Sequence, residues 1–81
     1  MNIKILGSGC MNCKTLHKRT EEALNELHLQ ATIEKVEDYQ AIAAFNIMKT
    51  PGLVIDGKVV VAGFVPPTDK LKEILLAHQD V

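Results

Sequence analysis

The sequence predicts an α/β fold with elements in the order strand, helix, strand, helix, strand, strand, helix. Three observations support this order. An apolar segment at the start is followed at once by a run with helical spacing, segments rich in valine and isoleucine recur later, and Asp56-Gly57 separates two of them. Strands that alternate with helical patterns indicate a parallel pair joined by a helix, and Asp-Gly between two strands is a strong hairpin signal. We therefore expect one four-stranded mixed sheet with helices on both faces.

In the first half of the chain, the pattern predicts two parallel strands and a long helix between them. Residues 1–6 form an apolar strand that ends at the Gly-Ser-Gly turn of residues 7–9. Over residues 11–27, apolar side chains follow helical spacing, and the opposite face is charged. Residues 31–36 alternate in polarity, which is typical of a half-exposed edge strand. A right-handed helical crossover makes these two strands parallel.

The second half predicts a short helix, the hairpin and a last helix. Asp38 is placed to cap a helix that runs to Phe45, and Asn46 suits a left-handed helix end. The hairpin joins residues 53–55 to residues 58–62, and Pro-Pro-Thr-Asp before residue 70 opens the last helix.

The composition narrows the range of functions. A chain of 81 residues holds one core, so we expect a single domain over residues 1–81. Nine Lys and Arg against ten Asp and Glu give a net charge of −1, and there is no basic tract interleaved with aromatics to indicate nucleic-acid binding. No segment approaches the roughly 20 apolar residues of a membrane span, and the start lacks the pattern of a signal peptide. For these reasons we expect the protein in the cytoplasm. We expect a monomer, since little apolar area lies outside the predicted core.

Cys10 and Cys13 are the only two cysteines, and they fall where the first strand gives way to the helix. In a reducing compartment, paired cysteines are more often catalytic or metal-binding than structural. Unpaired backbone N–H groups and the positive end of the helix favour a thiolate at Cys10, and in such motifs the thiol pKa can fall to ~7 from a reference of ~8.5. Cys13 lies one turn further along, close enough to form a disulfide with it. This arrangement predicts that Cys10 attacks a substrate disulfide and that Cys13 then displaces the reduced product.

With this motif, and with Thr50-Pro51 directly before the hairpin, the chain resembles the thioredoxin superfamily. It is most similar to the small thioredoxin-like redox proteins of bacteria and archaea, and the similarity covers nearly the whole chain. The resemblance implies a minimal thioredoxin-like fold, with the strand of residues 1–6 in the centre and the sheet order 2-1-3-4. It also implies a protein-disulfide oxidoreductase that needs no bound cofactor. Its partners would be disulfide-containing proteins and a separate flavoprotein similar to thioredoxin reductase.

The resemblance also implies where substrates bind. The Thr50–Pro51 bond would be cis and would face the disulfide, and the Thr50 backbone would pair with an extended substrate segment. Gly63 matches a family glycine that leaves room for the partner chain. The expected substrate-binding residues are Gly9, Met11, Thr50, Pro51 and Gly63.

Three positions depart from thioredoxin itself. Gly9 replaces a tryptophan, and Met11-Asn12 replaces Gly-Pro between the cysteines. Lys4 stands where thioredoxin has a buried aspartate that assists proton transfer to the second cysteine. The redox potential and the route of that proton therefore do not carry over from the family.

The alternative interpretation is a carrier of soft metals. Two thiolates suit Cu(I) or Zn(II), and heavy-metal-associated domains also place a Cys-x-x-Cys motif after their first strand. Those domains end in a strand, whereas this chain ends in a helical pattern, so we favour the redox function and expect no metal site. His17, four residues after Cys13, is expected to be solvated among basic neighbours, and Tyr39 is expected to pack near the start of the second helix.

Overall fold

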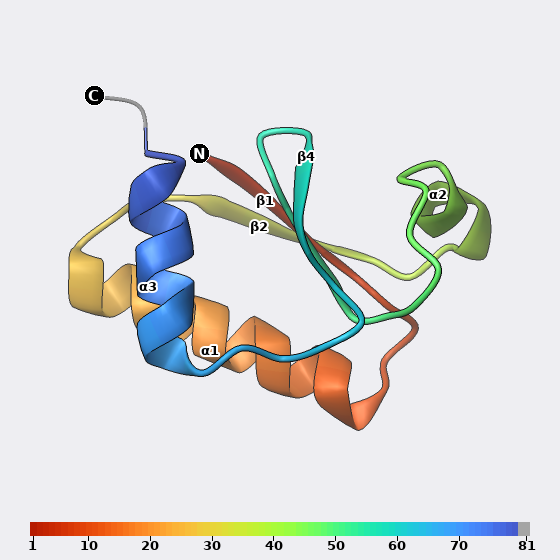
Figure 1. Cartoon of the computed structure of the whole chain (residues 1–81), viewed down its shortest axis with the longest axis horizontal. Coiled ribbons are helices and arrows are strands. Elements are labelled where there is room, and N and C mark those ends of the chain that lie inside the picture. Colours follow the sequence, from red (N-terminus) through yellow and green to blue (C-terminus); the bar gives the residue numbers. More distant parts are fainter. Residues whose placement is uncertain (80–81) are drawn as a thin grey trace.

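The computed structural model describes residues 1–79 and has the predicted elements in the predicted order (Figure 1). The α/β class is therefore confirmed. The strands are β1 (Asn2–Leu6), β2 (Thr32–Val36), β3 (Gly52–Ile55) and β4 (Lys58–Ala62). The helices are α1 (Met11–Leu27), α2 (Tyr39–Ala43) and α3 (Thr68–Ala77).

The four strands form one mixed sheet in the order β2-β1-β3-β4, which confirms the predicted order. β1 runs parallel to β2 and antiparallel to β3, and β3 and β4 are antiparallel. Because β1 and β3 run in opposite directions, Leu6 at the end of β1 pairs with Gly52 at the start of β3. The residues that follow β1 and those that precede β3 therefore meet at the same end of the sheet.

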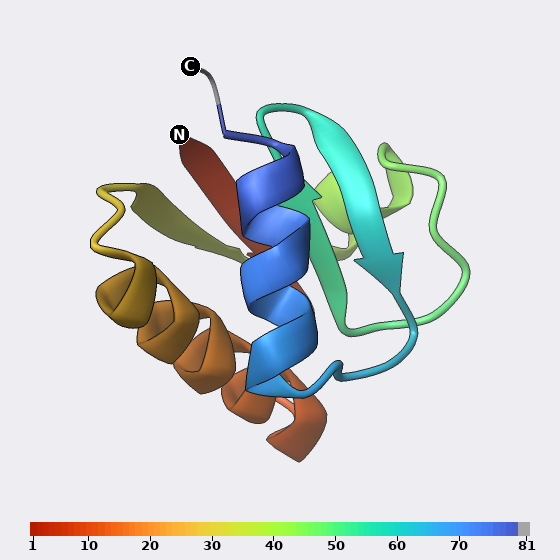
Figure 2. The same cartoon turned by 60° about the vertical axis from the view of Figure 1, so that its left-hand side comes forward.

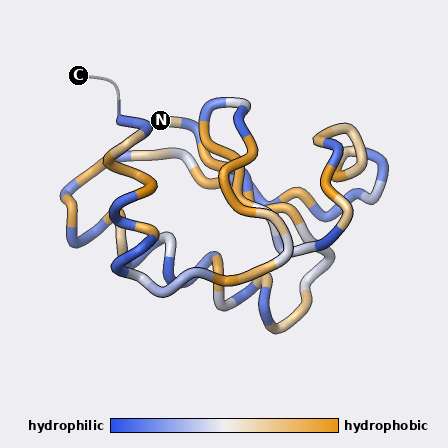
Figure 3. Tube along the Cα trace, viewed as in Figure 1, coloured by the Kyte–Doolittle hydropathy of each residue, from blue (hydrophilic) through white to orange (hydrophobic). Residues whose placement is uncertain are grey.

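Helices cover both faces of the sheet, as expected. Figure 2 shows α1 and α3 next to each other on the near face, with α2 beyond the sheet. The larger core joins Ile3 and Ile5 of β1 to Leu16 of α1 and Leu71 and Leu75 of α3, all at most 3% exposed. A second, smaller cluster lies under α2 and consists of Leu6, Val36, Ile42 and Val54. In Figure 3, hydrophobic residues accordingly lie along the strands, whereas hydrophobic and hydrophilic residues alternate along α1.

The hairpin turns at Asp56-Gly57, as predicted. Both residues have positive φ, 47° and 86°, which is the backbone that a two-residue type I′ turn requires. In the hairpin, Leu53 pairs with Val61 but Val54 pairs with Val59, so Val60 is an extra residue in β4. This β-bulge lets Val60 as well as Val61 pack against the larger core.

Two local expectations around the second helix differ from the structure. Asp38 caps the helix by accepting a hydrogen bond from the Ala41 N–H (3.2 Å), but α2 ends at Ala43 instead of Phe45. The chain there tightens into a turn, in which the Asn46 N–H donates to the carbonyl of Ala43 at 2.9 Å, and Asn46 takes the left-handed conformation. Tyr39, the first residue of α2, does not pack: it is 84% exposed.

Candidate functional site

The two cysteines form a disulfide directly after the turn that follows β1. Cys10 is the N-cap of α1, and Cys13 lies in its first turn, with 5.1 Å between their Cα atoms. The phase of the helix separates their environments: Cys10 is exposed, whereas Cys13 turns toward the core and is only 5% exposed. The Sγ atom of Cys10 accepts a hydrogen bond from the Cys13 N–H at 3.2 Å. A thiolate at this position would receive the same N–H group and the positive end of the α1 dipole.

Gly7 provides the space in which the buried sulfur lies. Its N–H is bonded to the carbonyl of Val36 at 2.9 Å, which fixes the backbone between β1 and β2. A β-carbon at Gly7 would overlap the Sγ atom of Cys13. The same β-carbon would lie 3.8 Å from the Cβ atom of Thr50. Gly7 therefore brings the Cys13 sulfur and the segment before β3 together.

The segment of residues 49–51 lies beside the disulfide and is held from the other side by the loop after β4. The Thr50–Pro51 peptide bond is cis, and Pro51 is buried. The Gly63 N–H donates to the Pro51 carbonyl at 2.8 Å. A β-carbon at Gly63 would come within 2.9 Å of the Cβ atom of Lys49, so glycine permits this close approach. Gly63 also has a φ of 85°, which favours glycine.

Of the other residues expected at the site, Gly9 and Met11 flank the exposed Cys10. Gly9 is exposed, and a β-carbon there would meet no atom within 4 Å. Met11 is 78% exposed. Sequence reasoning missed two further exposed apolar side chains, Met48 (96% exposed) and Phe64 (57% exposed), which adjoin Lys49 and Gly63. Their signal in the sequence was their closeness to predicted substrate-binding residues: Phe64 directly follows Gly63, and Met48 precedes Thr50 by two residues.

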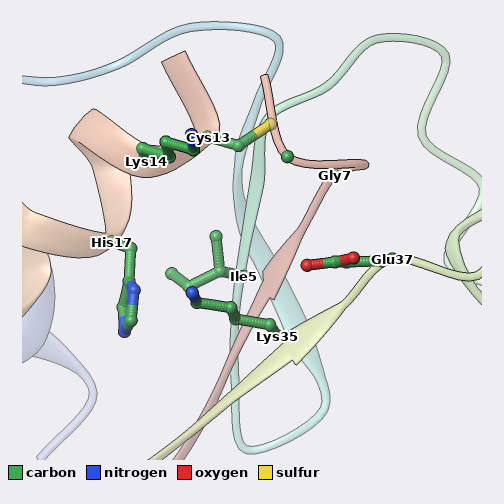
Figure 4. A pocket seen from close by; sticks show the side chains of 8 residues that line it. Ile5, Gly7, Cys13, Lys14, His17, Lys35 and Glu37 are labelled. Carbon is green, nitrogen blue, oxygen red and sulfur yellow. The ribbon is translucent and has the colours of Figure 1, made fainter. Parts of the chain in front are cut away.

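A cavity of about 70 Å³ lies beside Cys13, on the side of β2 (Figure 4). Its walls come from the three neighbouring elements β1, α1 and β2 and from the residues that follow the strands. They are Ile5, Gly7, Gly9, Cys13, Lys14, His17, Lys35 and Glu37. Figure 4 shows the carboxylate of Glu37 and the ring of His17 on opposite sides of Ile5 and Lys35. The cavity thus places ionisable groups of both signs next to the buried cysteine.

His17 is not the freely solvated side chain that we expected from its basic neighbours. Its side chain is only 24% exposed, and its Nε2 atom lies 3.6 Å from Oε1 of Glu21, one turn further along α1. The helix turns His17 toward β2 and away from the face that carries Lys18. Among residues 1–79, no three His, Cys, Asp or Glu side chains are grouped as metal ligands would be.

Residues 1–76 match the family model described as thioredoxin domain. A thioredoxin of Methanothermobacter thermautotrophicus is 37% identical over 75 residues, which cover 93% of this chain and 97% of the relative. A thioredoxin of Methanocaldococcus jannaschii is 34% identical over 76 residues, which cover 94% and 87%. The chain belongs to the thioredoxin family. Thioredoxins exchange disulfides with their substrates and are reduced by a thioredoxin reductase, so this member is a protein-disulfide oxidoreductase whose redox pair is Cys10 and Cys13.

Within this thioredoxin fold, Lys4 has a role away from the disulfide. It lies in β1 between Ile3 and Ile5, so its side chain extends to the opposite face of the sheet, on the side of α2. There its Nζ atom stands 5.6 Å from the centre of the Phe45 ring, a cation–π contact. No helix in the described part of this thioredoxin-family chain is long and apolar enough to cross a membrane.

Proposed function

We propose that the protein reduces disulfide bonds in other proteins, with Cys10 as the attacking thiol and Cys13 as the resolving thiol. The observation that carries this assignment is the difference in exposure within one disulfide, since Cys10 is exposed and Cys13 is 5% exposed. Only an exposed sulfur can meet a disulfide on another protein. The hydrogen bond from the Cys13 N–H and the helix dipole further favour the thiolate of Cys10.

The reaction proceeds by two exchanges. The Cys10 thiolate attacks one sulfur of the substrate disulfide, forms a mixed disulfide and releases the other substrate sulfur as a thiolate. Cys13, after losing its proton, attacks the Cys10 sulfur, and the second substrate thiolate leaves. The two cysteine sulfurs are thereby oxidised to the disulfide, and the substrate takes up two electrons and two protons.

The substrate segment would bind in extended form across Gly9, Met11, Thr50, Pro51 and Gly63. Support comes from the closeness of Thr50 to Gly7, beside the Cys13 sulfur, and from the hydrogen bond that the Gly63 N–H donates to the Pro51 carbonyl. The Thr50 backbone would pair with the substrate as a neighbouring strand does. The exposed side chains of Met11, Met48 and Phe64 are suited to contact apolar residues on either side of the substrate cysteine.

We further propose that residues 1–81 act as one domain, as a monomer in the cytoplasm and without a bound cofactor. A separate flavoprotein similar to thioredoxin reductase would return the protein to the dithiol form by disulfide exchange. Support for this partner comes from the family, whose members receive electrons in that way.

The test is to trap the mixed disulfide. Cys13→Ser should accumulate covalent complexes with cellular proteins through Cys10, because the resolving thiol is absent, and these complexes should dissociate in a reducing gel. Cys10→Ser is the matched control and should trap far less, since its remaining thiol is buried. Equal trapping by both variants, or none by Cys13→Ser, would overturn the assignment.

A further inference from the structure

The resolving step poses a question about a proton. Cys13 must become a thiolate before it can attack the Cys10 sulfur, yet only 5% of its surface is exposed. The cavity that Cys13 lines is a space that water can occupy. A single water needs roughly 10–15 Å³ measured in this way, so a cavity of about 70 Å³ holds several. A proton from Cys13 can therefore pass through water to a group on the cavity wall.

His17 is the wall group that is best placed to receive it. It follows Cys13 by four residues on α1, so the two side chains are neighbours on one face of the helix, and both line the cavity. Glu21 continues the same face and engages the imidazole at Nε2. With its Nε2 side toward the Glu21 carboxylate at 3.6 Å, the imidazole has Nδ1 left to accept a proton. Cys13, His17 and Glu21 thus form a row of thiol, base and orienting carboxylate.

We propose that His17 is the proton acceptor for the Cys13 thiol in the resolving step and that Glu21 is a positioning residue for His17. The inference rests on the proposed function, in which Cys13 resolves the mixed disulfide. In the step, the S–H proton of Cys13 moves through cavity water to Nδ1 of His17. The Cys13 sulfur forms its bond to Cys10, the bond between Cys10 and the substrate breaks, and the departing thiolate is protonated from the imidazolium or from water.

The other charged groups of the cavity fit different roles. The ammonium groups of Lys14, on α1, and Lys35, on β2, have no lone pair at neutral pH and stabilise a nearby thiolate by charge. Glu37, directly after β2, is the rival acceptor, but a carboxylate is a weaker base than an imidazole. β1 and the turn after it contribute only Ile5, Gly7 and Gly9, which do not titrate. Imidazole is the side chain that most often serves as a general base in enzymes, so His17 fits the role of acceptor best.

The two exchanges can be followed separately in the reduced, full-length protein. Ellman's reagent, an aromatic disulfide, releases one coloured thiolate when Cys10 attacks it and a second when Cys13 resolves the mixed disulfide. In stopped-flow experiments, the first phase depends on reagent concentration and the second does not, because the second is intramolecular. The Cys13→Ser variant, which should release only one equivalent, identifies the second phase.

We expect His17→Gln to slow the second phase at least tenfold near neutral pH, since a positioned general base contributes ~10²–10⁴-fold. The variant should also lose the pH dependence that the second phase owes to this base, and it should keep the first phase. Glu21→Gln should slow the second phase less and keep its pH dependence. Glu37→Gln, and the matched control His78→Gln at the end of α3, should leave both phases as they are.

The outcomes separate the two proposals. If the wild-type protein shows no fast first phase, the assignment of Cys10 fails, and with it the proposed function. If both phases are present but His17→Gln leaves the second phase and its pH profile unchanged, the role of His17 is refuted and the function stands. A slower second phase with an unchanged pH profile also refutes proton transfer, as does a flat profile in Glu37→Gln.

Discussion

The Sγ atom of Cys13 lies against the backbone of Gly7, so close that a β-carbon on Gly7 would overlap it. Gly7 is itself buried and is anchored by its bond to the Val36 carbonyl at 2.9 Å, so it cannot move aside easily. The sulfur is confined between this glycine and the first turn of α1. The fit makes the disulfide sensitive to a single methyl group at one position.

The first prediction concerns this fit. Gly7→Ala should destabilise the oxidised protein by about 2–3 kcal/mol, since overfilling a packed site typically costs 1–3 kcal/mol. The penalty should be smaller in the dithiol form, in which Cys13 is free to turn its sulfur away. Gly9→Ala is the matched control: its β-carbon meets nothing, so only its left-handed backbone (φ 79°) costs energy, and by the same amount in both redox states. Urea unfolding of each variant, oxidised and reduced, measures these differences. Equal penalties for Gly7→Ala in the two states would contradict the prediction.

The second prediction concerns the reactivity of the reduced cysteines. Cys10 should react with iodoacetamide at a pH well below the reference thiol pKa of ~8.5, because a backbone N–H and the start of α1 stabilise its thiolate. Cys13 should react slowly at every pH, since it is buried. Peptide mass spectrometry after timed alkylation reads the two sites separately. If both cysteines behave as ordinary thiols and Cu(I) or Zn(II) protects both, the protein is better described as a metal carrier.

The third prediction concerns the loop between β4 and α3. The Nη1 atom of Arg19 donates to the carbonyl oxygens of Val65 (3.4 Å) and Pro66 (3.1 Å), which ties this loop to α1. Arg19→Met keeps the apolar stem but removes both bonds, so we expect a loss of about 1.5 kcal/mol, typical of a hydrogen bond to a charged group. Lys18→Met, at an exposed neighbouring position, should change stability by less than ~0.5 kcal/mol. Indistinguishable urea midpoints for the two variants would show that the loop does not depend on Arg19.

The fourth prediction compares two buried residues on α1. Thr20, with no exposed surface, donates its hydroxyl to the Leu16 carbonyl at 2.8 Å, within its own helix. Because that carbonyl also faces the backbone N–H one turn on, Thr20→Val should change the free energy of unfolding by less than ~1 kcal/mol. Leu16→Ala should cost about 2–5 kcal/mol, because it leaves a cavity in the larger core. Chemical unfolding distinguishes them, and a large loss in Thr20→Val would show that the hydroxyl is required.

Local signals predicted most of the fold. The strand before Gly7, the helix that begins beside Cys10 and the Asp56-Gly57 turn each depend on residues close in sequence, and all three are where the sequence placed them. The sheet order followed from the family resemblance, which supplied the long-range pairing that periodicity does not contain. The end of α2 was predicted two residues too far, since Phe45 continues the apolar pattern although the backbone already turns there.

Local signals also predicted part of the site. Cys10 and Cys13 are marked by their spacing, and the phase of a helix makes one exposed and the other buried. The cavity was not predicted, because Lys35 reaches it only through the pairing of β2 with β1, in which Lys35 lies opposite Ile5. His17 was misjudged because neighbours in sequence point to other faces of the helix. Its surroundings are set by Glu21 and by the strand across the cavity.

The extra residue in β4 affects how two copies of the protein would meet. β4 is an edge strand of the sheet and has three consecutive valines at residues 59–61. If the strand were regular, this apolar edge could pair with a strand of another chain. With Val60 inserted, the strand twists, and the row of outward N–H and C=O groups loses its even spacing. Along this edge a second copy would meet an uneven row of N–H and C=O groups, which disfavours continuous strand pairing between two copies.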